Sequence, residues 1–299
     1  MTAAVAALNI VVGLVYFQYG TMTAIEMRRN WREMGWSRFG IAWMLMAFTC
    51  GPHHLVHGIH IAAEGRPAGG LDLVASVIAF PAAVTWFWLR VEVFRGGRGD
   101  RFIHSSPLWI LAMPTAFCVY VTVVVMTMIH DGGVAARGLQ MAIPNLLLVG
   151  TYGMVGLYLT RTQLHNRRPL GGWSLSGLSL TLIFATCSVM HAVFAVYTLR
   201  GIYPPDAHHV VVDWLGVPAG LYFLYVVRSL YRGGATDWNR TRAPRAVPPA
   251  IADETAPVAL PARPAPPWRP SRAGRLLSMD ALQGRQNDRE LESTIRERS

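Results

Sequence analysis

The sequence predicts an all-α integral membrane protein, a bundle of about seven transmembrane helices with the N-terminus outside and the C-terminus in the cytoplasm. Apolar residues make up 52% of the 299 residues, and charged residues only 15%, whereas soluble domains carry about 25% charge. Most of these charges lie in short loops and in the tail after Tyr231. Between them run apolar stretches of about 20 residues, the length that crosses a bilayer.

Seven such stretches follow one another along the chain. The predicted spans are Ala4–Glu26, Phe39–Ala63, Leu71–Val93, Leu108–Ile129, Gln140–Leu159, Leu175–Leu199 and Val210–Leu230. The first, third and fifth loops are rich in arginine, whereas each of the other loops holds a single one: Arg66, Arg137 and Arg200. Because positively charged loops remain in the cytoplasm, this alternation predicts the orientation. We therefore expect a multi-pass protein of the cell membrane.

The chain divides into two parts of different composition. Residues 1–232 form the predicted seven-helix domain, and residues 233–299 form an arginine- and proline-rich tail. Such a tail cannot bury enough apolar surface to offset the entropy of ordering it, so it is predicted to be disordered in the cytoplasm. The lipid bilayer is the main expected partner, and the tail offers a contact for a cytoplasmic protein or for anionic lipid. Cytoplasmic loops of membrane proteins commonly collect arginine, so the net charge of +10 does not indicate a nucleic-acid partner, and none is expected.

The second span holds the most unusual motif of the chain, Cys50-Gly-Pro-His-His-Leu-Val-His-Gly-Ile-His60. At about 100° per residue, His53, His57 and His60 fall on one helical face, with His54 at its edge. Ionisable side chains are costly inside a membrane and usually face the interior of a bundle. The motif therefore indicates a histidine stripe that points toward other helices.

Later spans bring matching groups to the same depth, near the outer leaflet. These are His191 in the sixth span and His209 and Asp213 in the seventh. Imidazole and carboxylate groups bind zinc, and the nearby thiols of Cys50 and Cys187 would favour copper. The sequence thus predicts a transition-metal site that acts in metal-dependent catalysis or in metal sensing and handling, and leaves open whether the protein is an enzyme. The predicted ligands are His53, His54, His57, His60, His191, His209 and Asp213.

Two other interpretations of these histidines stay open. Two of them on facing helices could be axial ligands of b-type haem. Without a metal, histidines that titrate near pH 6.5 would suit a proton-responsive sensor or transporter. A retinal protein is excluded, because retinal needs a lysine for its Schiff base and the sequence contains no lysine.

Seven helices with a His/Asp set shared by early and late spans resemble the membrane hydrolases related to alkaline ceramidases and adiponectin receptors. That resemblance implies a zinc ion held by histidines and an aspartate. In this chain, however, the last span has no HxxxH pair, because His209 and Asp213 occupy that spacing. No residue is assigned from the resemblance.

The fifth span carries glycines at a three-residue spacing, Gly150, Gly153 and Gly156. Small residues along one face let helix backbones approach closely. This pattern predicts tight packing of that face against a neighbouring helix.

Overall fold

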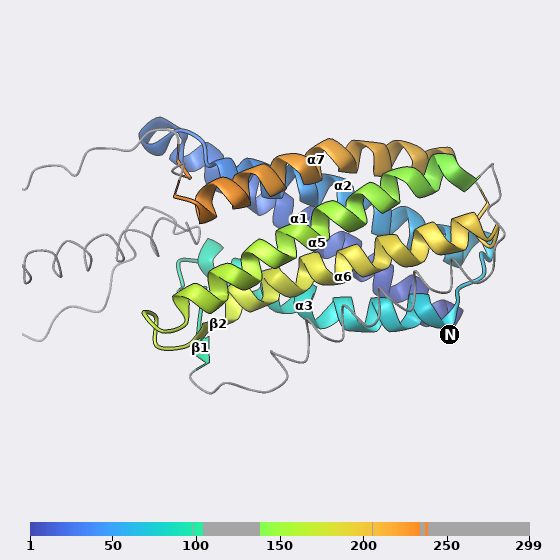
Figure 1. Cartoon of the computed structure of the whole chain (residues 1–299), viewed down its shortest axis with the longest axis horizontal. Helices are drawn as coiled ribbons and strands as arrows, with labels where there is room; N and C mark the ends of the chain where they lie inside the picture. The colour runs from blue at the N-terminus through green and yellow to red at the C-terminus, as the bar shows by residue number, and fades with distance from the viewer. Residues whose placement is uncertain (98, 104–137, 205, 234–236, 239–299) are drawn as a thin grey trace, which may run out of the picture.

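The computed structural model describes residues 1–97, 99–103, 138–204, 206–233 and 237–238. Within these ranges the chain forms six long helices and a pair of two-residue strands (Figure 1). The helices are α1 (Thr2–Met34), α2 (Arg38–Glu64), α3 (Gly70–Phe94), α5 (Leu139–Asn166), α6 (Leu175–Leu199) and α7 (Ala207–Tyr231). Strands β1 (Phe102–Ile103) and β2 (Trp173–Ser174) pair antiparallel. The predicted all-helical architecture is confirmed for the described residues.

Five of these helices, α1, α3, α5, α6 and α7, are long and apolar enough to cross a membrane. This supports a multi-pass membrane protein. Helix α2 is of similar length, 27 residues, but carries the four histidines. The predicted span Leu108–Ile129 lies outside the described residues. The count of seven spans and the orientation of the termini therefore stay predictions.

The helices form a closed ring in which contacts run α1–α2–α7–α5–α6–α3 and back to α1. Helices α2 and α6 run opposite to the other four (Figure 1). Outward faces carry exposed apolar side chains such as Ile78, Leu215 and Tyr225. Such faces are compatible with contact with lipid. Polar side chains of these helices, by contrast, are largely buried inside the ring.

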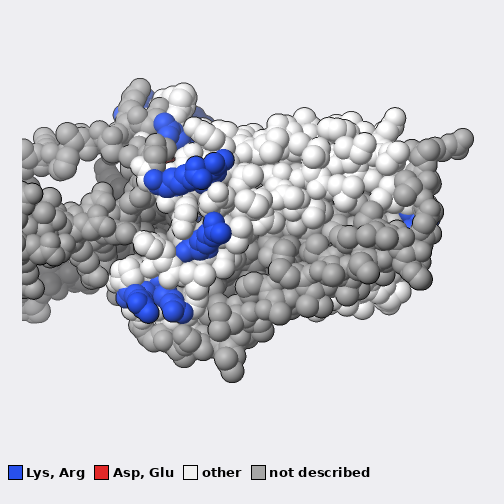
Figure 2. Space-filling model, in the orientation of Figure 1, with Lys and Arg blue, Asp and Glu red and all other residues white. Residues whose placement is uncertain are grey.

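The two ends of the bundle differ in charge. Arginines gather at one end, which we call the arginine end (Figure 2). The exposed arginines near the C-terminal ends of α1, α3 and α5 include Arg28, Arg29, Arg32, Arg95, Arg101, Arg161 and Arg168. At the other end, which we call the histidine end, the described loops carry Arg66 and Arg200. This is the asymmetry from which the sequence predicts a cytoplasmic arginine end.

Helix α2 begins at a hydrogen-bonded junction with the end of the described chain. The Ser37 hydroxyl accepts a hydrogen bond from the Gly40 amide at 2.7 Å and donates to the Asp237 carboxylate at 2.9 Å. That carboxylate also accepts from the Phe39 amide at 2.8 Å. A negative charge is favourable at a helix N-terminus, so Asp237 stabilises the start of α2. Residues 239–299 lie outside the described residues, and the tail stays a prediction.

Helices α1 and α2 approach each other most closely at glycines. A Cβ atom on Gly58 would lie 2.9 Å from the Ala6 carbonyl oxygen and 3.1 Å from the Ile10 amide nitrogen. A Cβ on Gly13 would lie 2.9 Å from the Gly51 carbonyl oxygen. Any larger residue at these positions would push the two backbones apart.

The glycine face predicted on α5 is packed less tightly. Gly153 and Gly156 face α6, where a Cβ would meet its nearest atoms at 3.8 Å, an ordinary contact. Gly150 has open space around it among the described residues.

Candidate functional site: a buried histidine cluster

Three helices bring their polar side chains together inside the ring, at the histidine end. Helices α2 and α6 run in the same direction and contribute His53, His57 and His191 from their second halves. Helix α7 runs the other way and contributes His209 and Asp213 from its first turns. All five side chains are buried, with at most 4% of any residue exposed. We call these five residues the histidine cluster.

At the centre of the cluster, His53 Nδ1 lies 2.6 Å from Asp213 Oδ1. The rings of His53 and His191 are 4.6 Å apart between centroids. One ligand atom each from His53, His191 and Asp213 lies within 4.8 Å of the others. The three side chains could therefore hold one metal ion.

Asn145 of α5 orients two members of this group. Its Nδ2 donates to Asp213 Oδ2 at 2.6 Å, and its Oδ1 accepts from His191 Nδ1 at 2.5 Å. Because Asn145 Oδ1 can only accept, the proton of His191 is on Nδ1, and Nε2 of that ring keeps its lone pair. A hydrogen bond from the second ring nitrogen is the usual way to orient a metal-binding histidine. Sequence reasoning missed Asn145, although a polar amide inside an apolar span is itself a signal of function.

His209 and His57 each offer a further free nitrogen. His209 Nδ1 donates to Asp206 Oδ2 at 2.9 Å, while its Nε2 is buried without a hydrogen-bond partner among the described residues. His57 Nε2 lies 3.9 Å from Asp72 Oδ1, and its Nδ1 is likewise buried and unpartnered in that part of the chain. Both rings lie close to that of His53, at 5.5 Å for His209 and 6.4 Å for His57 between centroids. Neither ring, however, has a nitrogen in the group of ligand atoms that lie within 4.8 Å of one another.

A second group of possible metal ligands lies nearer the end of the bundle and consists of His60, Asp206 and His208. Asp206 Oδ2 lies 2.7 Å from His60 Nδ1 and 3.0 Å from Arg66 Nη2. Burial alone would raise the pKa of Asp206, but hydrogen bonds from the His209 side chain and the His208 amide hold this pKa well below its ordinary value. Because Arg66 already supplies a positive charge here, this group suits a metal ion less well than the histidine cluster does.

His54 points away from the cluster. Its Nδ1 lies 2.9 Å from Asn9 Oδ1, and its ring meets the edge of Tyr16. The two thiols also have other partners: Cys50 Sγ lies 3.0 Å from the Tyr152 hydroxyl, and Cys187 Sγ 3.3 Å from the Tyr16 hydroxyl. Neither metal-binding group found among the described residues includes a cysteine. The role of every predicted ligand in binding metal stays a prediction.

The two remaining carboxylates near the cluster also have partners. Asp72 accepts hydrogen bonds from the Tyr203 hydroxyl and from the Gly69 amide. Burial and the Asp72 charge together raise the pKa of Tyr203. Glu64 is half exposed and pairs with Arg66 at 3.2 Å.

No family model, no curated protein and no solved structure matches this chain.

Proposed function

We propose that this multi-pass membrane protein binds a divalent transition metal ion, zinc by preference, in the histidine cluster, and that it senses, stores or passes this ion. The observation that carries the proposal is the convergence of His53, His191 and Asp213 within 4.8 Å in a buried position. A metal ion bound by both His53 and Asp213 would replace the proton that these two side chains share, while Asn145 holds the His191 ring from the side opposite its free nitrogen. This arrangement of outer partners is typical of metal-binding histidines.

The ligand chemistry favours zinc. Two imidazoles and one carboxylate, from His53, His191 and Asp213, make up a nitrogen and oxygen set of the kind that zinc accepts. The thiols that would favour Cu(I) are engaged by Tyr16 and Tyr152 instead. Haem is disfavoured, because a haem with two axial histidines places the macrocycle between the rings. The centroids of the His53 and His191 rings are only 4.6 Å apart, which leaves no room for a macrocycle between them.

Metal handling is favoured over hydrolysis by the state of the carboxylates. A zinc hydrolase needs an open coordination position with a general base beside it. Around this cluster, Asp213 is hydrogen-bonded to His53 and Asn145, Asp72 to Tyr203, and Asp206 to Arg66 and the histidines. None of these described carboxylates is left over to activate a water molecule.

The test is elemental analysis and an absorption spectrum of the full-length protein in lipid nanodiscs, purified without chelators. We expect near-stoichiometric zinc and no Soret band for the wild type. The variant His191→Ala should lose the metal. Iron with a Soret band, or a wild-type protein that cannot be loaded with any divalent transition metal, would overturn the proposal.

The matched control is His165→Ala, which removes an exposed histidine at the arginine end. This variant should keep its full metal content. The melting temperature of each variant is measured alongside, so that loss of metal is separated from loss of fold. Equal metal content in His191→Ala and His165→Ala would contradict the assignment of His191.

A further inference from the structure

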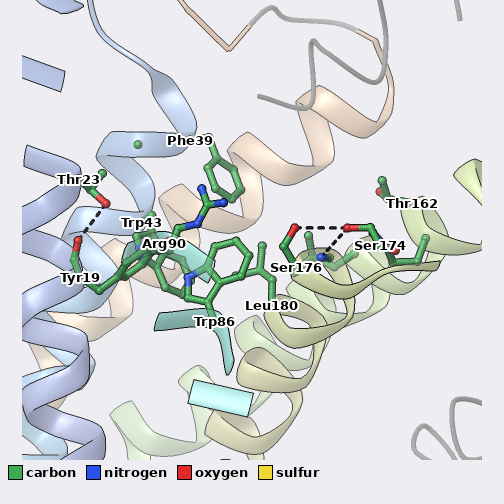
Figure 3. Close-up of a pocket in the computed structure, with 14 residues that line it drawn as sticks. Tyr19, Thr23, Phe39, Trp43, Trp86, Arg90, Thr162, Ser174, Ser176 and Leu180 are labelled. Atoms are coloured by element: carbon green, nitrogen blue, oxygen red, sulfur yellow. Dashed lines mark hydrogen bonds between the residues drawn. The ribbon is translucent and has the colours of Figure 1, made fainter. Parts of the chain in front are cut away.

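A pocket lies at the arginine end, away from the histidine cluster (Figure 3). Its walls come from α1, α2, α3, α5 and α6 and include the aromatic side chains of Tyr19, Phe39, Trp43 and Trp86. It encloses about 50 Å³ of space that the centre of a water-sized molecule can occupy. One such position needs roughly 10–15 Å³ on this measure, so the pocket has room for a small polyatomic group.

Arg90 of α3 extends into this pocket with little to bind. The residue is 5% exposed, and its guanidinium lies over the ring of Trp86, 4.8 Å from the centroid. Its one hydrogen bond to a described residue is a long one, from Nη2 to the Gly99 carbonyl at 3.4 Å. Its Nε is buried without a partner in the described part of the chain. Figure 3 shows the guanidinium among Phe39, Trp43 and Trp86.

No described carboxylate neutralises this charge by direct contact. Glu26 and Asp100 act on Arg90 through their fields, but neither forms an ion pair with it among the described residues. Asp100 instead accepts hydrogen bonds from the Ser174 hydroxyl and the Ser176 amide.

A second donor in the same wall is also unused. The indole nitrogen Nε1 of Trp43 is buried and has no hydrogen-bond partner among the described residues. Trp43 is only 1% exposed, so water does not readily satisfy this group. Nε1 of Trp86, in the same pocket, is likewise buried without a partner in the described part of the chain. Buried polar groups are nearly always hydrogen-bonded, and three unpaired donors in one pocket indicate a missing acceptor.

From this geometry we infer that the pocket binds a carboxylate or phosphate group carried by a molecule with an aromatic or apolar body. An unpaired buried charge is strongly unfavourable, and contact with an aromatic face offsets only part of that cost. A guanidinium presents a planar set of donors that matches the oxygens of a carboxylate or phosphate. The Trp43 indole would donate to the same anion, and the aromatic walls would contact the rest of the ligand.

The test uses the full-length protein in phosphatidylcholine nanodiscs and follows its melting temperature. The probes are benzoate and phenyl phosphate, with benzyl alcohol as the uncharged counterpart. We expect saturable stabilisation by at least one of the two anions and none by benzyl alcohol. Stabilisation by neither anion, or equal stabilisation by benzyl alcohol, would overturn the inference.

Two variants that each remove one positive charge test whether the anion binds at Arg90. Arg90→Gln should weaken anion binding by about ten-fold or more, since hydrogen bonds to charged groups contribute roughly 1.5–3 kcal/mol. Arg95→Gln removes an exposed arginine from the same helix end and should bind as the wild type does. Without ligand, Arg90→Gln should melt no lower than the wild type, because it removes an unpaired buried charge. Equal loss in both variants contradicts the site.

Trp43→Phe provides a second variant in case Arg90→Gln does not fold. It keeps an aromatic wall but removes the indole donor, so it should weaken anion binding while leaving the selectivity over benzyl alcohol. Nanodiscs containing phosphatidic acid then identify the source of the anion. If this lipid stabilises the wild type and abolishes the response to benzoate, the occupant is a lipid headgroup; if the response persists, it is a soluble anion. Binding by Trp43→Phe equal to that of the wild type would contradict the assigned donor.

Discussion

Asn145 provides the sharpest test of the metal proposal, because it holds the cluster in place without being one of the proposed ligands. The variant Asn145→Leu keeps a side chain of similar size and leaves His53, His191 and Asp213 in the chain. It removes the hydrogen bonds of 2.5 Å to His191 and 2.6 Å to Asp213. The His191 ring then loses the acceptor that fixes its tautomer, and Asp213 loses a donor.

The expected magnitude follows from these two contacts. Loss of an outer partner typically weakens metal binding 10–100-fold, which corresponds to about 1.4–2.7 kcal/mol. We expect the zinc Kd of Asn145→Leu to rise within this range, measured by competition with a chromogenic chelator in nanodiscs. Without metal, the variant should also be destabilised by about 1–3 kcal/mol, because buried partners are left unsatisfied.

Thr151→Val is the control for this experiment. Thr151 is a buried polar residue on the same helix, but its hydroxyl donates within α5, to the Leu147 carbonyl at 2.8 Å. Its loss should leave the zinc Kd unchanged. A zinc Kd for Asn145→Leu within about two-fold of the wild type, or an equal rise in Thr151→Val, would refute the reasoning.

Three further predictions concern packing and pH. Gly58→Ala should destabilise the protein by about 1–3 kcal/mol in denaturant titrations, because its Cβ meets backbone atoms of α1 at 2.9 and 3.1 Å; Gly150→Ala, in open space, should be neutral or stabilising, and the reverse order would contradict the packing. Zinc binding should weaken as the pH falls, because protons compete with the metal for the imidazole nitrogens; a Kd that does not rise at any acid pH at which the protein stays folded would argue against histidine ligands. Because the pKa of Asp206 is lowered, its carboxylate stabilises the fold above its ordinary pKa of about 3.9, and this stabilisation is lost as the pH falls below that value. Asp206→Asn should therefore flatten the acid limb of melting temperature against pH, and parallel curves for the two proteins would contradict it; the groups that face this carboxylate are His60, Arg66, His208 and His209.

Hydropathy predicted the helices well because each apolar stretch ends in polar residues. Predicted span Leu175–Leu199 coincides with α6, and the other described helices overlap their spans. The main difference is at α1, which continues to Met34 rather than ending near Glu26. Arginine has a helix propensity as high as that of most apolar residues. The helix can therefore continue beyond its membrane-spanning part, through Arg28, Arg29 and Arg32.

Helix packing was harder to predict because it depends on which faces meet. The glycine spacing on α5 indicated close packing, yet its contacts are looser than the one that joins Gly13 of α1 to Gly51 of α2. Glycines lie seven residues apart on both helices, at Gly13 and Gly20 of α1 and at Gly51 and Gly58 of α2, but spacing along one helix does not reveal which helix packs against it.

The candidate site was predicted as a set of residues but not as a network. Histidine spacing placed His53, His57 and His191 at one depth, and the structure gathers them. His54 is not part of the cluster, because its side chain turns toward Asn9 of α1. Successive residues of a helix point about 100° apart, so His54 faces a different helix from the one that His53 faces. Asn145 and the pocket around Arg90 depend on contacts between helices, which spacing along one helix cannot reveal.

The composition of α2 has a consequence for how the protein is made. Alone among the six described helices, α2 is not apolar enough to count as a membrane span by itself, because it places four histidines where lipid would surround an isolated segment. Polar residues at the centre of a segment oppose its insertion into the bilayer. The close contacts at Gly13 and Gly58 pack α2 against α1. Because α1 is synthesised immediately before α2, it is available as a partner when α2 reaches the membrane. We therefore expect α1 and α2 to enter the membrane together as a helical hairpin, with α1 acting as the anchor for the helix that carries the site.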